Sequence, residues 1–321
     1  MTLAHKILGQ ITVDSTGVAV QPKPFVAVGS GDIIAYSADG ITWTAPTSPV
    51  SGTWHALAFG GGTYAALRRN STDAMYSTDA ITWTASALPV SADWKSVTYG
   101  DGKFAAVAYN STAAAYSTDG ITWTASALPV SADWKSVTYG NDKFVAVVYN
   151  SNKGAYSTDA ITWTETTMPA STQWQSVTYG GGTFAAIAYY TSAAAYSTNG
   201  ITWTQTALSA SRAWESVAYG NGKFVAVAKY GPPPTGSVST DGITWTSTTL
   251  PDGRSQVAHS GSAFVALGDY STSALYSTDA ITWTEYANAT PSSSVVWSDL
   301  SGGDVNYEGI GYTAPQTIYT V

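Results

Sequence analysis

One position of a repeated peptide carries a carboxylate or carboxamide in all seven copies, a series that could bind calcium or supply catalytic acids. The peptide reads Tyr-Ser-Thr-Asp-Gly-Ile-Thr-Trp-Thr or a near copy. Its acidic position is occupied by Asp39, Asp79, Asp119, Asp159, Asn199, Asp241 and Asp279. Because Asn199 is uncharged, the position requires a hydrogen-bond acceptor and does not require an anion. We therefore interpret these residues as structural acceptors for turn amides, and predict no catalytic residue, metal or cofactor.

The next position of the peptide bears on the backbone of the same turn. It is occupied by Gly40, Ala80, Gly120, Ala160, Gly200, Gly242 and Ala280. Since alanine occupies it in three copies, we infer that the backbone here need not adopt a conformation reserved for glycine. The tryptophan that ends the peptide is expected to bury its ring beneath the turn.

A second group of candidate residues lies in loops that vary between the copies and are rich in Tyr, Asn, Ser and Thr. Aromatic faces stack on the C–H surfaces of sugars, while hydroxyls and amides bind sugar hydroxyls. Tyr and Arg are equally common in protein contacts. The candidate ligand-binding residues are Arg68, Arg69, Tyr109, Tyr149, Tyr189, Tyr190, Tyr230, Arg254 and Tyr270.

The spacing of the repeated peptide indicates the fold that positions these loops. Its tryptophans are separated by 40, 40, 40, 40, 42 and 38 residues, a period typical of propellers. Each unit contains four short β-type runs, A to D, separated by turns. We predict an all-β, seven-bladed β-propeller of four-stranded antiparallel blades. The A–B and C–D turns lie on one face, and the variable B–C and D–A loops lie on the other.

The two ends of the chain predict how the ring closes. The first repeat lacks a strand A of its own, while Val296-Trp297-Ser298-Asp299 resembles one. We therefore expect this C-terminal strand to complete the first blade and to remove the open edges. The domains are predicted as an N-terminal extension over 1–23, the propeller over 24–303 and a C-terminal extension over 304–321.

Tryptophan opens strand A in six of the seven units. These residues are Trp54, Trp94, Trp134, Trp174, Trp214 and Trp297, with Arg254 in the remaining place. They could line the channel or pack between blades, and packing is favoured because large apolar groups that repeat usually belong to a core. Arg254 breaks the series and is a candidate for marking a pocket.

Composition excludes several classes of function. The net charge of −8 and the 13 Lys and Arg in 321 residues argue against nucleic acid. The chain has no cysteine, so disulfides and thiolate metal sites are excluded. No long apolar run is present, so no membrane insertion is expected. The N-terminal sequence shows no signal peptide.

Ser-Thr-Asp-Gly-Ile-Thr-Trp resembles the Asp-box, or BNR repeat, although it is one residue shorter than the usual form. The resemblance covers all seven repeats. It implies propeller architecture and a structural part for the box in the turn between the third and fourth strands. The motif occurs in sialidases, other glycoside hydrolases, a photosystem assembly factor and many bacteriophage virion proteins, so it does not by itself imply an activity.

We predict a non-enzymatic virion protein: a tail, fibre or capsid-surface component in a phage particle. Its terminal extensions would bind other virion proteins, and its loop face would contact a host surface glycan or protein. The alternatives are a glycoside hydrolase or sialidase-like enzyme, and a free lectin. A sialidase needs an arginine cluster, whereas this chain has four arginines. A glycosidase needs two opposed carboxylates, and the loop face carries few acids.

Overall fold

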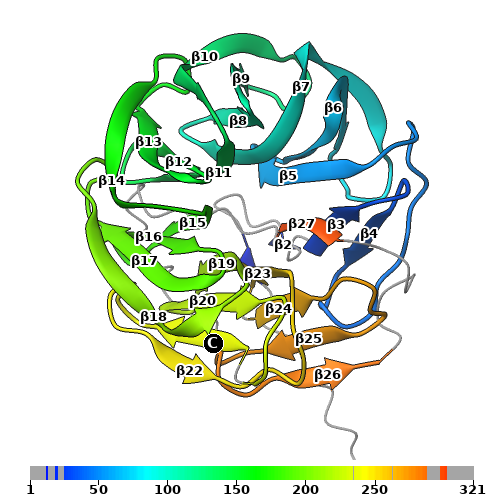
Figure 1. Cartoon of the computed structure of the whole chain (residues 1–321). Helices are drawn as coiled ribbons and strands as arrows, with labels where there is room; N and C mark the ends of the chain where they lie inside the picture. Colours follow the sequence, from blue (N-terminus) through cyan, green and yellow to red (C-terminus); the bar gives the residue numbers. More distant parts are fainter. Residues whose placement is uncertain are drawn as a thin grey trace, which may run out of the picture.

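A computed structural model describes residues 25–233, 235–261, 263–287 and 297–301, together with the backbone of residues 12–13 and 19–20. The rest of the predicted extensions, 1–23 and 304–321, lies outside the described residues. The strands form a ring of sheets around a central channel, as Figure 1 shows. The protein is therefore an all-β propeller, as the repeat predicted.

Most of the ring consists of four-stranded antiparallel blades whose strands follow chain order. These are β11 (Trp134–Gly140), β12 (Lys143–Val148), β13 (Ser151–Ser157) and β14 (Thr164–Thr172); β15 (Trp174–Gly180), β16 (Thr183–Ala188), β17 (Thr191–Ser197) and β18 (Thr204–Arg212); β19 (Trp214–Gly220), β20 (Lys223–Ala228), β21 (Gly236–Ser239) and β22 (Thr246–Thr248); and β23 (Gln256–Ser260), β24 (Ala263–Leu267), β25 (Ala274–Ser277) and β26 (Thr284–Tyr286).

Two sheets of the ring differ from this plan, and a small sheet lies outside it. The six-stranded sheet contains β5 (Trp54–Gly60), β6 (Thr63–Ser77), β7 (Thr84–Gly100), β8 (Lys103–Tyr109), β9 (Ser111–Ser117) and β10 (Thr124–Ala132). The three-stranded sheet contains β27 (Trp297–Ser301), β3 (Phe25–Gly29) and β4 (Ile34–Ser37). The small sheet pairs β1 (Thr12–Val13) with β2 (Ala19–Val20).

In the part of the chain that the structure describes, the ring has six sheets, so the prediction of seven separate blades is wrong in number. The reason is the continuity of β7, which pairs with β6 through its first half and with β8 through its second. Asp93 makes this possible because it pairs with both Arg69 and Tyr109. The strands of two repeats thereby form one sheet.

The ring closes through the strand that the sequence indicated. β27 pairs antiparallel with β3, and Trp297 lies opposite Gly29. The strands nearest the channel contact one another in the cyclic order β27, β5, β7, β11, β15, β19, β23 and back to β27. We call these the inner strands. Figure 1 shows them around the centre, with the later strands of each sheet farther out.

The hydrophobic core lies between neighbouring sheets. The second strand of the four-stranded sheets is mostly apolar, and in β3 and β24 every residue is buried. One cluster joins Ala105 of β8 to Trp134 and Phe144 of the next sheet. All six tryptophans that open inner strands are buried. All six belong to hydrophobic core clusters, which confirms the packing that the sequence favoured, and Trp297 also borders the channel.

The seven repeated peptides form turns with the same hydrogen bonds. In the first copy, the Asp39 carboxylate accepts hydrogen bonds from the Ile41 and Thr42 amides at 2.8 Å each, and from the Ser37 hydroxyl at 2.9 Å. The Asn199 carboxamide oxygen accepts the equivalent amide bonds at 2.9 and 2.8 Å. These turns therefore need an acceptor and not a charge.

The backbone at the next position of this turn corrects the inference drawn from alanine. Ala80, Ala160 and Ala280 have φ of 68°, 63° and 65°, and the corresponding glycines have φ between 72° and 76°. The position therefore does take the left-handed conformation that favours glycine. Alanine occupies it at a cost of about 1 kcal/mol, and its buried methyl group recovers part of that cost.

Candidate ligand-binding face and channel

The inner strands are joined around the channel by serine hydroxyls. Each hydroxyl accepts a hydrogen bond from an amide of the neighbouring inner strand, as Ser136 does from Val177 at 3.2 Å. Ser96, Ser176 and Ser216 accept the equivalent bonds at 3.1 to 3.3 Å. At the closure Asp299 replaces serine, and its Oδ2 atom accepts from the Leu57 amide at 2.8 Å. This ladder fixes the side chains beside it.

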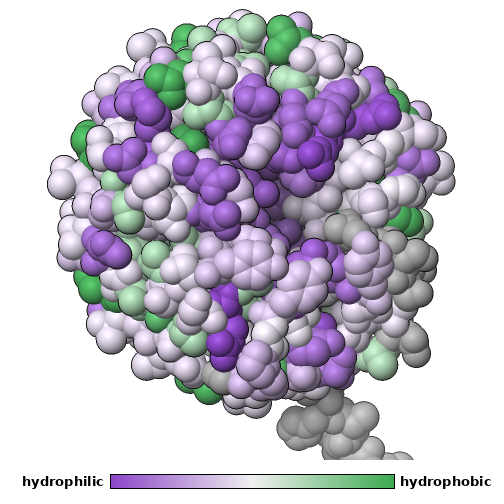
Figure 2. All heavy atoms as spheres, viewed as in Figure 1, coloured by the Kyte–Doolittle hydropathy of each residue, from purple (hydrophilic) through white to green (hydrophobic). Residues whose placement is uncertain are grey.

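The residue directly after the tryptophan or arginine of strand A faces the channel, and its type varies around the ring. The inner strands place His55, Lys95, Lys135, Gln175, Glu215, Ser255 and Ser298 there. They line a cavity of about 420 Å³ in the centre of the ring. Figure 2, viewed along the channel, shows hydrophilic side chains around a central hollow. Cavities of this size commonly hold small molecules.

One side of this cavity is rich in cationic groups. The Lys95 ammonium lies 3.2 Å from the Asp93 carboxylate, which also pairs with the Arg69 guanidinium at 2.9 Å. Burial lowers the pKa of Lys95 to about 8, with further lowering by Arg69 and Lys135, although Asp93 opposes the shift. Burial, followed by the charges of the two lysines and Arg69, holds the pKa of His55 well below its ordinary value.

The opposite side is mixed in charge. The Glu215 carboxylate accepts a hydrogen bond from the Gln175 carboxamide, and burial raises the pKa of Glu215 despite the opposing charges of Lys135 and Lys229. Lys229 and Asp269 form an ion pair at 2.5 Å. The cavity is thus electrostatically asymmetric, with its least compensated positive charge beside Lys135.

Two tyrosines of the variable loop face lie close to lysines that line the cavity. Lys95 lies over the ring of Tyr109 at 5.3 Å, and Lys135 lies near that of Tyr149 at 5.9 Å. The Tyr189 and Tyr190 rings are 4.1 Å apart. Of the predicted ligand-binding tyrosines, the structure therefore places Tyr109 and Tyr149 against channel lysines and Tyr189 against its neighbour.

Tyr190 and two further tyrosines project into solvent. Tyr190, Tyr230 and Tyr270 are 63%, 54% and 67% exposed, and they occupy the same B–C position in three consecutive repeats. In the three preceding repeats this position carries Asn70, Asn110 and Asn150. We call the three exposed residues the tyrosine arc.

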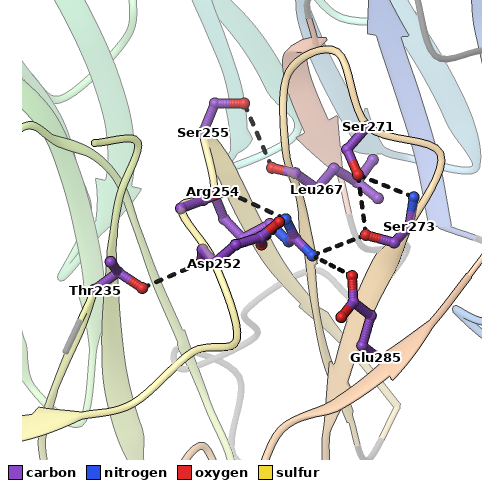
Figure 3. Close-up of polar contacts among 9 residues, drawn as sticks. Thr235, Asp252, Arg254, Ser255, Leu267, Ser271, Ser273 and Glu285 are labelled. Carbon is purple, nitrogen blue, oxygen red and sulfur yellow. Dashed lines mark hydrogen bonds and ion pairs between the residues drawn. The ribbon is translucent and has the colours of Figure 1, made fainter. Parts of the chain in front are cut away.

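The predicted arginines have different environments. Arg68 pairs with Asp73, and Arg69 with Asp93 at the rim of the cavity. Arg254 is 1% exposed, so it does not present its guanidinium at the loop face. As Figure 3 shows, it pairs with Asp252 and donates to the Ser273 hydroxyl at 3.0 Å. Its role is to bind loops together, which corrects its prediction as a ligand-binding residue.

The substitution at Arg254 is matched by its surroundings. A Cβ atom on Gly268 would lie 2.9 Å from the Arg254 Nη1 atom. Four of the six strand-A tryptophans pair with alanine or valine, as Trp94 does with Ala108, whereas Trp54 pairs with Arg68 and Trp297 with Gly29. The Glu285 carboxylate also lies 3.5 Å from Nη2. Burial lowers the pKa of Arg254, and the charges of Asp252 and Glu285 oppose that shift.

Sequence reasoning missed the channel residues His55, Lys95, Lys135 and Gln175. A signal was available, because the residue after the strand-A tryptophan is His, Lys, Lys, Gln, Glu and Ser in the six copies that have this tryptophan, while the residue after that is serine in four of them. A position that varies within an otherwise repeated strand does not take part in core packing, so its side chain is expected to face an open surface.

Among the described residues, no group of three or more His, Asp or Glu side chains is arranged to hold a metal ion. The same residues include no helix with the length and apolarity needed to span a membrane.

No family model matches the chain, and no curated protein matches it. Similar solved structures include a catalytically inactive virginiamycin B lyase from Staphylococcus aureus with quinupristin, at 14% identity and a TM-score of 0.65, covering 73% of this chain and 84% of that one. A streptogramin B lyase has 12% identity and a TM-score of 0.66, with 84% and 89% covered. YCF48 bound to D1 peptide has 14% identity and a TM-score of 0.59, with 84% and 94% covered. At these identities the similarity shows the fold alone.

Proposed function

We propose that this protein is a non-enzymatic glycan-binding propeller that contacts its ligand through the tyrosine arc. The observation that carries the proposal is the exposure of Tyr190, Tyr230 and Tyr270 at one position of three consecutive repeats. Exposed aromatic rings present apolar faces to a sugar ring, and their hydroxyls remain available for hydrogen bonds.

Backbone conformation strengthens this argument. Asn70, Asn110 and Asn150 have φ between 50° and 58°, and asparagine tolerates this left-handed region. Tyr190 and Tyr270 adopt φ of 54° and 55° at the same position, where tyrosine costs more. Because the rings remain exposed, burial does not offset that cost. A role in binding accounts for tyrosine at this position in spite of its backbone cost.

The rings are also held in place by their neighbours. Tyr190 packs on Tyr189, and the Lys229 ammonium lies 5.2 Å from the centre of the Tyr230 ring. An aromatic platform that is ordered before binding loses less conformational entropy when a ligand arrives. A flat sugar surface fits such a platform, and the neighbouring cavity offers room for a branch.

The carboxylates near the arc support binding more than hydrolysis. Asp93 is shared by Arg69 and Lys95. Asp269 pairs with Lys229, accepts a hydrogen bond from the Ser255 hydroxyl at 2.8 Å and accepts another from the Trp297 amide at 3.1 Å. A glycosidase requires one acid that is free to donate a proton and a second that is free to act as base or nucleophile.

The test replaces arc tyrosines by the asparagine that other repeats use. Tyr190→Asn and Tyr270→Asn are expected to fold with unchanged or slightly higher stability, and to weaken binding on an array of neutral and acidic oligosaccharides at least about tenfold. Ile161→Ala changes a residue of the opposite face that is 42% exposed and serves as the control. Unchanged binding in both tyrosine variants would remove the arc from consideration, and release of cleaved sugar would contradict the non-enzymatic assignment.

For the biological setting, we propose attachment to a phage particle, on the strength of the sequence resemblance described above. The terminal extensions would make that attachment, and the arc would face the host. Mass spectrometry of purified native particles tests this setting. Recovery of the chain solely as a free protein would contradict it and would leave glycan binding as the function of a free lectin.

A further inference from the structure

Positive charge is concentrated on one side of the channel. Lys95 and Lys135 occupy the channel-facing position of adjacent inner strands, and Arg69 lies at the same rim. The corresponding position carries Gln175 on β15 and Glu215 on β19. This gathering occurs in a chain with a net charge of −8 and 13 Lys and Arg, so average composition does not account for it.

Lys95, Lys135 and Arg69 outnumber the carboxylates that lie in ion-pair contact with them. Asp93 is shared between Arg69 and Lys95. In the region that the structure describes, no carboxylate oxygen lies within 4.0 Å of the Lys135 ammonium. Burial lowers the pKa of Lys135, and the charge of Glu215 opposes that shift. Holding two ammonium groups near each other in a desolvated cavity costs free energy, which an anion between them would offset.

The remaining lining suits hydroxyl groups. Gln175 offers a carboxamide, Glu215 a carboxylate, and His55 is neutral near pH 7 because its pKa is held low. Lys95 and Lys135 thus face groups that can exchange hydrogen bonds with a polyol. The cavity of about 420 Å³ admits a small polar molecule, and its lining includes Lys229 and Asp269, which directly precede Tyr230 and Tyr270 in the chain.

We propose that this cationic sector binds the carboxylate of an acidic sugar, with Lys95 and Lys135 as counter-ions and with Gln175 and Glu215 bonded to the sugar hydroxyls. The saccharide part rests on the proposed function, because it places a sugar next to the tyrosine arc. The anion part rests on the channel residues alone. The channel would thereby select acidic sugars over neutral ones. The tyrosine arc cannot make this selection, because an aromatic face does not distinguish a neutral sugar from its acid.

Calorimetry with digalacturonate and with the matching neutral galactose disaccharide tests the inference. Wild-type protein is expected to bind the acidic sugar at least about tenfold more tightly, with a preference that weakens at high salt. Lys135→Met nearly keeps the length of the side chain and removes its charge, so it should abolish most of the preference for the acidic sugar. Lys95→Met should act in the same direction.

The control is Lys153→Met, because Lys153 is an exposed lysine on β13 that pairs with Glu165 at 2.9 Å. It should retain the full preference. Thermal unfolding of each variant verifies that it is folded, and the salt dependence of the wild type gives a readout that requires no variant.

The possible results separate this inference from the proposed function. Equal binding of the two sugars, or a preference that survives in both lysine variants, overturns the acidic-sugar site and leaves the arc untouched. Lys135-dependent binding of digalacturonate that Tyr190→Asn does not weaken supports the channel site and contradicts the arc. Binding of inorganic sulfate as tight as that of digalacturonate overturns the saccharide part, and binding of neither sugar overturns both proposals.

Discussion

The closing strand carries a partly buried aspartate where four inner strands carry serine, and this should make stability depend on pH. Asp299 accepts hydrogen bonds from the Leu57 and Leu300 amides at 2.8 and 2.9 Å. Burial nevertheless raises the pKa of its carboxyl from 3.8 to about 7. Between these values the folded protein holds a proton that the unfolded chain releases. Stability from this residue is therefore complete below pH 3.8 and is lost as the pH rises through about 7.

The size of the effect follows from the shift. One pKa unit corresponds to about 1.4 kcal/mol, so the full shift would correspond to roughly 4 kcal/mol. Because the Asp299 side chain also borders the channel, water reduces this value, and we expect roughly 2–4 kcal/mol. Asp299→Asn removes the ionisation and keeps an acceptor. For a chain of 321 residues it should raise the melting temperature at about pH 8 by about 3–6 °C and change it little at about pH 4.

Calorimetric unfolding of both proteins across this pH range measures the difference, in which the contributions of other titrating groups cancel. Asp279→Asn is the matched control, because the Thr282 and Ile281 amides hold the pKa of Asp279 at about 2. That residue contributes stability above about pH 4 and loses it only as the pH falls toward 2, so the control should be flat from about pH 5 to pH 8. Parallel curves for wild type and Asp299→Asn would refute the reasoning, as would a wild type that is more stable than the variant at about pH 8.

Three other predictions concern the same packing. Ser136→Ala leaves the Val177 amide without its acceptor, so urea unfolding should show a loss of roughly 1–3 kcal/mol; a loss below about 0.5 kcal/mol would show that water replaces the hydroxyl. Asp119→Asn should change the free energy of unfolding by less than about 0.5 kcal/mol. Asp119→Ala should lower it by about 1–2 kcal/mol, because two turn amides lose their acceptor. Equal effects of the two variants would contradict the role of Asp119 as a structural hydrogen-bond acceptor. Gly200→Ala introduces a Cβ atom 2.7 Å from Val145 Cγ2 at a φ of 72°, so it should cost roughly 2–3 kcal/mol; a neutral outcome in thermal unfolding would show that the sheets can shift apart.

The sequence predicted the propeller class, the buried tryptophans and the closing strand because each of these follows from a repeated local pattern. It did not predict the number of sheets. The peptides Thr84–Gly100 and Thr124–Gly140 are identical, yet the first forms the continuous β7 and the second breaks into β10 and β11. The difference lies in Arg69, which pairs with Asp93 from a neighbouring strand. Identical local sequences cannot encode different partners.

The candidate site was predictable in part for a related reason. The tyrosine arc stands at one position of the repeat, so alignment of the copies identifies Tyr190, Tyr230 and Tyr270. The burial of Arg254 depends on Gly268, Ser273 and Glu285, which lie in the same repeat but on other loops and strands, so their contact with Arg254 appears only once the sheet has folded. The sharing of Asp93 between two cations likewise depends on the pairing of β6, which carries Arg69, with β7, which carries Asp93 and Lys95.

The pairing of β27 with β3 has a consequence for how the protein forms. Trp297 and Gly29 lie about 270 residues apart, so this contact has a very high sequence separation and closes late in folding. Until the last inner strand leaves the ribosome, β3 has an open edge that can pair with another chain. For most of the time that the chain is being synthesised, the ring of sheets is therefore incomplete and its edge is exposed. The yield of native protein should depend on temperature and expression rate more steeply than its final stability suggests.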